Sequence, residues 1–341
     1  MSVAIRISIL VYQIQAVSSD RPNLIIEIQD LRQNMSGQKQ KIGVIGLGSM
    51  GFGVAHSALR AGHTVYGFDI NPEQVARFQA EGGAQGAMDD VANTLDAVVI
   101  IVLNAAQTES VLFGPDGIAA KLRKGAAILS SATVAPDFAR DMEKRCADLG
   151  LLYLDAPVSG GTGRAASGAL SIMSSGSDAA YEALGPTLDA IASNVFKLGD
   201  SAGAGSAMKA VNQLLVGVHL AACAEAMTFG ISQGIDPELM IDVIRKSAGT
   251  SWALENRGTK MSVANYKPES LINIWPKDLG IVQDIARGAQ FSTPIASAAL
   301  QVYLTAQGMG LGLEDDSAIT KVYAAQSGIT LPEPKKMDAS S

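Results

Sequence analysis

The stretch that decides the fold is residues 41–69, KIGVIGLGSMGFGVAHSALRAGHTVYGFD. It begins with a short apolar run, which is typical of a strand buried on both faces of a parallel sheet. A glycine turn comes next, then a helix expected from about Ser49 to Ala61, and then a second strand from Thr64 to Phe68. This order predicts a dinucleotide-binding unit, the first part of a Rossmann-type doubly wound parallel sheet.

Three glycines, Gly46, Gly48 and Gly51, fill the glycine positions of the pattern G-x-G-x-x-G. The first permits a tight turn, the second lets the backbone approach a pyrophosphate, and the third lets the helix pack against the strand. The start of the helix adds backbone N–H groups and a positive dipole end, which suit phosphate. We therefore expect cofactor contacts from the loop made of Gly46, Leu47, Gly48, Ser49, Met50 and Gly51.

Asp69 ends the second strand, twenty-three residues after Gly46. A carboxylate at this spacing accepts hydrogen bonds from ribose hydroxyls, and it repels the 2′-phosphate that distinguishes NADP. The first arginine after Asp69 is Arg77, so no adjacent cation offsets that repulsion. NAD is therefore the predicted cofactor.

The composition excludes several other classes of protein. The chain has 341 residues, of which 48% are hydrophobic, enough for about two domains with substantial cores. Its net charge of −7 argues against a nucleic-acid partner or an anionic membrane surface. Cys146 and Cys223 are far apart, no apolar run approaches the roughly 18 residues of a membrane span, and no metal-ligand spacing is visible. We expect a cytoplasmic protein with no metal site.

Four segments are expected along the chain. Residues 1–40 differ from the rest in carrying no glycine before Gly37, and they form an N-terminal extension, or alternatively an extra surface element. Residues 41–202 alternate short apolar runs with helical stretches, as an α/β unit requires. Residues 203–331 are helical and begin with a long interdomain helix, and residues 332–341 form a polar tail. The plan is an α/β domain followed by an all-helical domain.

Further candidate cofactor contacts lie where buried strands end, because ligands of open α/β sheets bind outside the carboxyl ends of the strands. Leu103 and Asn104 end the apolar run that starts at Asp96, and Thr133 follows the run 127–130. Asn104 has an alternative role as the cap of a loop. We expect all three near the nicotinamide half of the cofactor.

A nicotinamide enzyme that acts on an alcohol needs a group that accepts the hydroxyl proton. Of the three histidines, His56 and His63 belong to the glycine-turn helix and its exit, where packing or exposure to solvent is expected. His219 lies on the long helix ten residues after Lys209, which is about 15 Å along a helix axis. These placements favour Lys209 over histidine.

Lys209 lies among small residues near the start of the long helix, and Asn212 and Gln213 follow on the same face. An exposed lysine is the alternative interpretation. A lysine with its ordinary pKa of about 10.4 cannot accept a proton at neutral pH, so burial or a cation must lower that pKa. Lys277 could be that cation, or it could bind the substrate carboxylate or the cofactor.

Two loops carry further polar groups. The glycine-rich loop 156–163 exposes backbone N–H groups beside the hydroxyl of Ser159, a combination that suits a carboxylate, although it could equally be a plain turn. Asp315 and Asp316 are expected in a solvated acidic turn.

Residues 41–331 resemble the 3-hydroxyisobutyrate (β-hydroxyacid) dehydrogenase family. The resemblance rests on four patterns in the family's order: GLGxMG, DAPVSGG, GxGxxxKxxN and KDLG, here at residues 46–51, 155–161, 203–212 and 277–280. It implies an NAD-binding domain, a helical domain and a catalytic lysine at Lys209. It also implies that the substrate carboxylate is held by Ser159, Gly160 and Gly161, and that Asn212, Gln213, Thr133 and Lys277 contact substrate or cofactor. Gln213 departs from the family's second asparagine, which favours a substrate other than hydroxyisobutyrate.

Within the family, the segments VLNAAQTESVLFG, GTSWALENR and GLEDDSAITKVY look most like the branch that acts on L-threonate. The expected activity is therefore NAD-dependent oxidation of a small polyhydroxylated acid in the cleft between two domains. Reduction of a semialdehyde such as tartronate or succinic semialdehyde is one alternative, and a non-catalytic NAD sensor is another. The resemblance and the apolar long helix also predict a homodimer or homotetramer.

Overall fold

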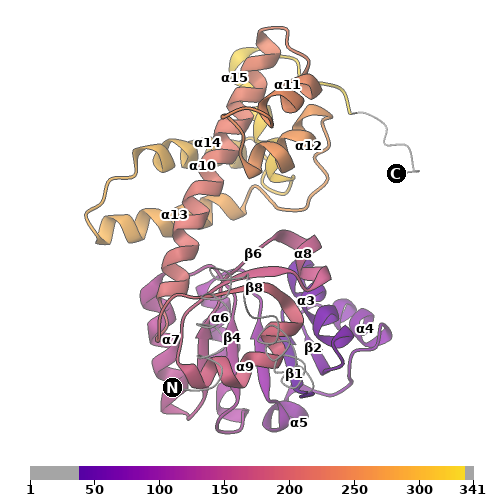
Figure 1. Ribbon diagram of the computed structural model, residues 1–341, viewed down its shortest axis with the longest axis vertical. Coiled ribbons are helices and arrows are strands. Elements are labelled where there is room, and N and C mark those ends of the chain that lie inside the picture. The colour runs from indigo at the N-terminus through magenta and orange to yellow at the C-terminus, as the bar shows by residue number, and fades with distance from the viewer. Residues whose placement is uncertain (1–37, 335–341) are drawn as a thin grey trace, which may run out of the picture. The chain divides into compact units, whose positions relative to one another are not determined.

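A computed structural model describes residues 38–334 of the chain, which fall into two compact units divided between Ser206 and Ala207 (Figure 1). The boundary falls within the first turn of the long helix that the sequence predicts. The predicted N-terminal extension lies outside the described residues except for its last three positions, and so does most of the predicted tail.

The first unit contains a five-stranded parallel sheet with the order β2-β1-β3-β4-β5. Its in-register pairs include Ile42 with Val65 on one side of β1 and Ile42 with Ala97 on the other. The central position of β1 places the turn after it at the point where the strand order reverses, which is where open α/β sheets bind ligands. The strands are β1 (Lys41–Ile45), β2 (Thr64–Phe68), β3 (Ala97–Ile100), β4 (Ala127–Ser130) and β5 (Leu152–Asp155).

Both faces of this sheet are covered by helices, which explains why its strands are almost continuously apolar. Val44 and Val99 belong to one core cluster with residues of α3 and α9, whereas Val98 and Ile100 belong to another with residues of α6 and α7. The helices of this sheet are α3 (Ser49–Arg60), α4 (Pro72–Ala80), α5 (Met88–Val91), α6 (Ala105–Phe113), α7 (Pro136–Asp148) and α9 (Asp178–Ile191).

A second, three-stranded sheet with the order β6-β7-β8 extends the first unit. The middle strand pairs antiparallel with β6 and parallel with β8. The elements are β6 (Val158–Ser159), the short helix α8 (Gly161–Ser167), β7 (Leu170–Ser174) and β8 (Ala192–Lys197). Part of the glycine-rich loop expected from the sequence is therefore helical, because α8 begins at Gly161.

The second unit is helical, and its core surrounds the later turns of α10 (Ala204–Ser232). Leu220, Ala224 and Met227 of this helix are buried against residues that include Trp275 and Tyr303. The remaining helices are α11 (Pro237–Ile244), the π-helix η3 (Leu254–Gly258), α12 (Thr259–Ser262), α13 (Ile274–Gly288), α14 (Pro294–Gly308), the 3₁₀ helix η4 (Asp316–Ile319) and α15 (Thr320–Ser327).

The long helix α10 corrects one expectation. An 18-residue window of α10 has a mean hydropathy of 1.7, so by length and composition this helix is apolar enough to cross a membrane, although the sequence suggested no such stretch. Its alanine-rich and leucine-rich composition has another cause in this unit, because its buried residues form the core of the helical fold. The predicted class, a doubly wound parallel sheet followed by a helical region, is confirmed.

Candidate functional site

The glycine turn after β1 has the shape that the sequence predicts. Gly46 has φ +93°, and a β-carbon on it would lie 2.2 Å from the carbonyl oxygen of Ile101. A β-carbon on Gly51 would lie 1.7 Å from the carbonyl oxygen of Gly46. Around Gly48, in contrast, a β-carbon would meet nothing within 4 Å. Two glycines are thus required by packing, and the third leaves open space over the backbone.

This turn fits the pyrophosphate of a dinucleotide. The helix α3 begins at Ser49, and no side chain accepts a hydrogen bond at its N-cap, Gly48. The first N–H groups of a helix need acceptors, and phosphate oxygens can supply them. Open space at Gly48 and uncapped N–H groups behind it therefore form a cradle for phosphate.

Asp69 is held beside the glycine turn by two backbone groups. The N–H of Leu47 donates to Oδ2 of Asp69 at 2.6 Å, and the N–H of Asn71 donates to Oδ1 at 2.8 Å. A carboxylate oxygen can accept more than one hydrogen bond, so capacity remains for ribose hydroxyls. The geometry suits the adenosine ribose of NAD.

Cofactor preference should change when this carboxylate is replaced by a cationic site. Asn71 caps α4 by accepting a hydrogen bond from the N–H of Glu73, so the adjacent Ile70, which is fully exposed, is the better position for an arginine. We expect Asp69→Ser with Ile70→Arg to shift the ratio of kcat/KM values towards NADP by about 10- to 100-fold, the scale of one charge-assisted hydrogen bond. Ile70→Arg alone is the control, and an unchanged ratio in the double variant would contradict a ribose contact at Asp69.

The three residues predicted at strand ends have different surroundings. Leu103 is 63% exposed, so its side chain offers an apolar surface to a ring. Asn104 is the N-cap of α6, where its Oδ1 accepts from the N–H of Gln107 at 2.9 Å. Thr133 is partly buried just after β4. The structure thus contains the capping role that the sequence left open for Asn104, and its contact with the cofactor stays a prediction.

The candidate carboxylate-binding loop has an unusual backbone. Ser159 ends β6 and is partly buried, while Gly160 and Gly161 have φ values of +133° and +72°. Such conformations favour glycine, and they allow consecutive N–H groups to point to one side. The side chain of Arg164 packs over Gly160, where a β-carbon would lie 2.7 Å from its Cδ. The Ser159 hydroxyl and these backbone groups provide neutral donors for an anion.

In the helical unit, α10 and α13 bring four polar side chains together around Lys209. Nδ2 of Asn212 donates to Oε1 of Gln213 at 2.9 Å, and Nε2 of Gln213 donates to Oδ2 of Asp278 at 2.5 Å. The other oxygen of Asp278 is 2.5 Å from Nζ of Lys277. Asp278 is 2% exposed and Lys209 is 8% exposed, so the centre of this cluster is buried, whereas Asn212 and Lys277 are only partly buried.

The surroundings of Lys209 adjust its acidity. Burial lowers the pKa of Lys209 to about 8, helped by the positive charge of Lys277 and opposed by the negative charge of Asp278. A substantial fraction of this side chain is therefore a neutral amine near pH 8 and can accept a proton. The sequence identified burial and Lys277 as the two possible causes, and both operate.

Two acidic residues of the site were missed by reasoning from the sequence. Asp278 stood out only as part of KDLG, although a carboxylate next to Lys277 is a signal that an ion pair is available. Asp155 holds the first turn of α10: it accepts from the N–H groups of Gly203 and Ser206 at 2.9 and 2.8 Å, and from Oγ of Ser206 at 2.7 Å. Burial raises the pKa of Asp155, and these hydrogen bonds oppose that rise.

The expected solvated turn at Asp315 and Asp316 is wrong. Asp315 and Asp316 are 0% and 2% exposed. Their charges are tolerated in the interior because Lys260 and Arg257, which are also buried, form ion pairs with them. His63 has the packing role that the sequence predicts, because it is buried and its Nδ1 accepts from the N–H of Gln40, and His219 is exposed on α10.

Each unit thus gathers part of the predicted site. The first holds the glycine turn, Asp69, the strand-end residues and the loop at Ser159, and the second holds Lys209, Asn212, Gln213 and Lys277. The described residues contain no group of three His, Cys, Asp or Glu side chains arranged to hold a metal ion.

Comparisons with known proteins match both units of the chain. Residues 41–199 match the model of the NAD binding domain of 6-phosphogluconate dehydrogenase, and residues 203–323 match that of the NAD-binding region of NADP-dependent 3-hydroxyisobutyrate dehydrogenase. L-threonate dehydrogenase of Cupriavidus necator is 49% identical over 86% of this chain and 98% of its own length. That of Escherichia coli K12 is 44% identical over 88% and 99%. A crystal structure of 3-hydroxyisobutyrate dehydrogenase from Salmonella typhimurium is 45% identical, with a TM-score of 0.79 over 83% of this chain and all of that one.

Proposed function

Since this chain belongs to the 3-hydroxyisobutyrate dehydrogenase family of NAD-dependent hydroxyacid dehydrogenases, we propose that its substrate is a small polyhydroxylated acid, with L-threonate as the first choice. The product would be 2-dehydro-L-erythronate. The observation that carries this choice is the similarity to L-threonate dehydrogenases, which are 44–49% identical over nearly their whole length.

The proton acceptor in this proposal is Lys209. As the substrate alcohol becomes a carbonyl, its O–H proton passes to the neutral amine at Nζ, and its C–H hydrogen leaves as hydride. NAD⁺, when bound, supplies the acceptor for that hydride. The pKa of about 8 supports this role, because the amine is partly neutral before reaction and can hold the proton afterwards.

The other residues have binding roles in the proposal. Ser159, Gly160 and Gly161 donate to the substrate carboxylate, and Asn212 donates to a substrate hydroxyl. Gln213 already donates to Asp278 and accepts from Asn212, which supports a role in orienting these neighbours as well as the substrate. Lys277 contributes positive charge near the lysine and can contact substrate or cofactor. Leu103, Asn104 and Thr133 contact the nicotinamide half.

A substrate panel tests the proposal. The purified protein is assayed with C3 and C4 hydroxy acids, L-threonate and its stereoisomers among them, and with tartronate and succinic semialdehydes, using both nicotinamide cofactors. The greatest kcat/KM is expected for L-threonate with NAD⁺. Greatest efficiency on a semialdehyde with NADPH would instead identify a reductase, and NAD binding without turnover on any substrate would identify a sensor.

The proposed location is the cytoplasm. Both cysteines, Cys146 and Cys223, are buried and free, and burial raises the pKa of each thiol to about 12. Thiols in that state are protonated and unreactive, as suits a protein that needs no disulfides.

We also propose a homo-oligomer, a dimer or a tetramer, built through the helical unit. Large apolar side chains on this unit remain exposed, among them Phe229 at 65%, Phe291 at 69% and Ile295 at 68%. A closed symmetric assembly would remove them from water. Light scattering at micromolar concentration should give two or four times the 35.3 kDa of one chain, and a mass near 35.3 kDa would contradict the proposal.

A further inference from the structure

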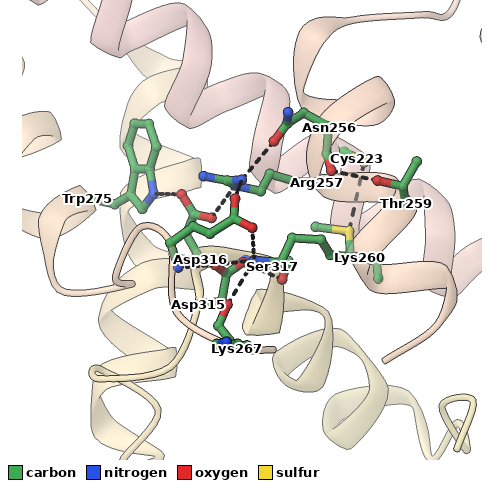
Figure 2. A network of polar contacts seen from close by, with 12 residues as sticks. Cys223, Asn256, Arg257, Thr259, Lys260, Lys267, Trp275, Asp315, Asp316 and Ser317 are labelled. Atoms are coloured by element: carbon green, nitrogen blue, oxygen red, sulfur yellow. Dashed lines mark hydrogen bonds and ion pairs between the residues drawn. The ribbon is translucent and has the colours of Figure 1, made fainter. Parts of the chain in front are cut away.

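The helical unit contains a buried network of charges that the proposed chemistry does not use (Figure 2). Nε of Arg257 lies 2.7 Å from Oδ1 of Asp316, and Nζ of Lys260 lies 2.6 Å from Oδ2 of Asp315. All four residues are at most 8% exposed. A buried ion pair is weak evidence for stability, since apolar residues of the same volume often serve equally well. The network therefore calls for another explanation.

One half of the network ends on a tryptophan. Nε1 of Trp275 donates to Oδ2 of Asp316 at 3.1 Å, and Figure 2 shows the carboxylate of Asp316 lying between the indole and the guanidinium of Arg257. The indole is also stacked on the ring of Tyr303, with centroids 5.6 Å apart. Asp316 thus holds the N–H edge of the indole, while Tyr303 packs against its face.

Trp275 is the second residue of α13, the helix that carries the ion pair of the lysine cluster. One turn later, Asp278 accepts from Nε2 of Gln213 on α10. A β-carbon on Gly217 of α10 would lie only 3.1 Å from the indole ring, so the start of α13 is pressed closely against α10. Any displacement of Trp275 would therefore move Lys277 and Asp278 relative to Lys209.

The other half of the network has a different attachment. Oδ2 of Asp315 accepts from the N–H of Glu269, and Nζ of Lys260 donates to the carbonyl oxygen of Lys267. These contacts fasten the segment before α13, and no contact between Asp315 and Trp275 is present among the described hydrogen bonds. Asp315 and Asp316 are adjacent and equally buried, yet only one of them holds the tryptophan.

We infer that Asp316 is a positioning residue for the proton acceptor. Through its hydrogen bond to Trp275, Asp316 fixes the position of the first turn of α13. That turn then determines where the charges of Lys277 and Asp278 lie and how well water is excluded from Lys209. This inference rests on the proposed role of Lys209. The charged groups on α13 that act on this amine are Lys277 and Asp278, and burial is the largest influence on it. A looser α13 would admit water, which returns the pKa of the lysine towards its ordinary value and moves it upwards.

The experiment measures kcat/KM against pH for the full-length protein with L-threonate and NAD⁺, or the best substrate found by the panel. Trp275→Phe removes the single N–H donor and keeps an aromatic ring, and Asp316→Asn removes the charge. Both should move the acid limb of the profile upwards by about half a pH unit to one unit, equivalent to a loss of about 3- to 10-fold at pH 7, with much smaller losses on the plateau above it. The double variant should shift no further than Asp316→Asn alone.

Asp315→Asn is the matched control, because it unpairs a neighbouring buried carboxylate that does not contact the indole. It should lower the melting temperature and leave the acid limb in place. A purely structural role for Asp316 would give the same pattern in all variants, a lower melting temperature with an unshifted limb, and that result would overturn the inference. If Asp316→Asn does not fold, Trp275→Phe alone decides.

The wild-type profile separates this inference from the proposed function. If its acid limb persists in Lys209→Ala, then Lys209 is not the group that titrates, and the proposed function fails whatever the network does. If the limb depends on Lys209 but Trp275→Phe leaves it unmoved, only the inference about Asp316 fails.

Discussion

Lys209→Ala should lower kcat by at least about 100-fold, the usual contribution of a general base, because Lys277, Asn212 and Gln213 of its cluster cannot take over as acceptors of the alcohol proton. Lys277 is paired with Asp278, and Asn212 and Gln213 are amides, which are not bases. Binding of NAD, measured by fluorescence or calorimetry, should change little, since the glycine turn belongs to the other unit.

The role of Lys209 also predicts the direction in which kcat/KM changes with pH. With a pKa of about 8, the amine of Lys209 is increasingly protonated below that pH, so kcat/KM for oxidation should fall about tenfold per pH unit there. Lys209→Arg keeps the positive charge but cannot lose its proton, and it should be as inactive as the alanine variant. Lys246→Ala, which removes an exposed lysine of the same unit, is the control. A loss of only a few-fold in Lys209→Ala would exclude the lysine mechanism.

The second large effect is expected at the glycine turn, where substitutions of Gly51 and Gly48 should have different consequences. In Gly51→Ala the new methyl group would lie 1.7 Å from a backbone oxygen, so the strand or the helix must move. We expect a loss of about 2–4 kcal/mol in the free energy of unfolding, the range for a backbone clash that cannot relax, together with weaker NAD binding. Thermal and denaturant unfolding of the variant without cofactor measure the first effect.

Gly48→Ala is the informative partner of that variant. Its methyl group would enter open space, so unfolding should change by less than about 1 kcal/mol, while the dissociation constant of NAD should rise at least about tenfold because the methyl group occupies the approach of the pyrophosphate. Equal effects of the two variants on both stability and cofactor binding would show that the turn does not hold phosphate in this way.

The sequence predicted the first unit well because its signals are local. The strand, glycine turn and helix of residues 41–69 are specified by neighbours in sequence, and α3 ends within one residue of the expected position. Bounds were less accurate where the apolar run continued beyond the sheet: the expected strand from Asp96 to Leu103 is only Ala97–Ile100, since β4 pairs with those four residues alone.

The polar residues of the second unit could not be placed from sequence, because their partners are distant along the chain. The sequence around Asp316 predicts a surface residue, because its counter-ion, Arg257, is 59 positions earlier and becomes a neighbour only in the folded chain. Asp278 likewise acquires its role from Gln213 on another helix. Lys209 was found because its neighbours Asn212 and Gln213 are within one helical turn, which is the range over which spacing alone is informative.

The buried Trp275 also gives the molecule an intrinsic fluorescence probe. The chain has two tryptophans, Trp275 and Trp252, which are 4% and 55% exposed and both belong to the helical unit. Emission from Trp275 should be shielded from acrylamide, whereas Trp252 should be quenched. Tryptophan fluorescence therefore follows the unfolding of the helical unit alone. Circular dichroism follows both units, so any gap between the two transitions would measure how independently the units unfold.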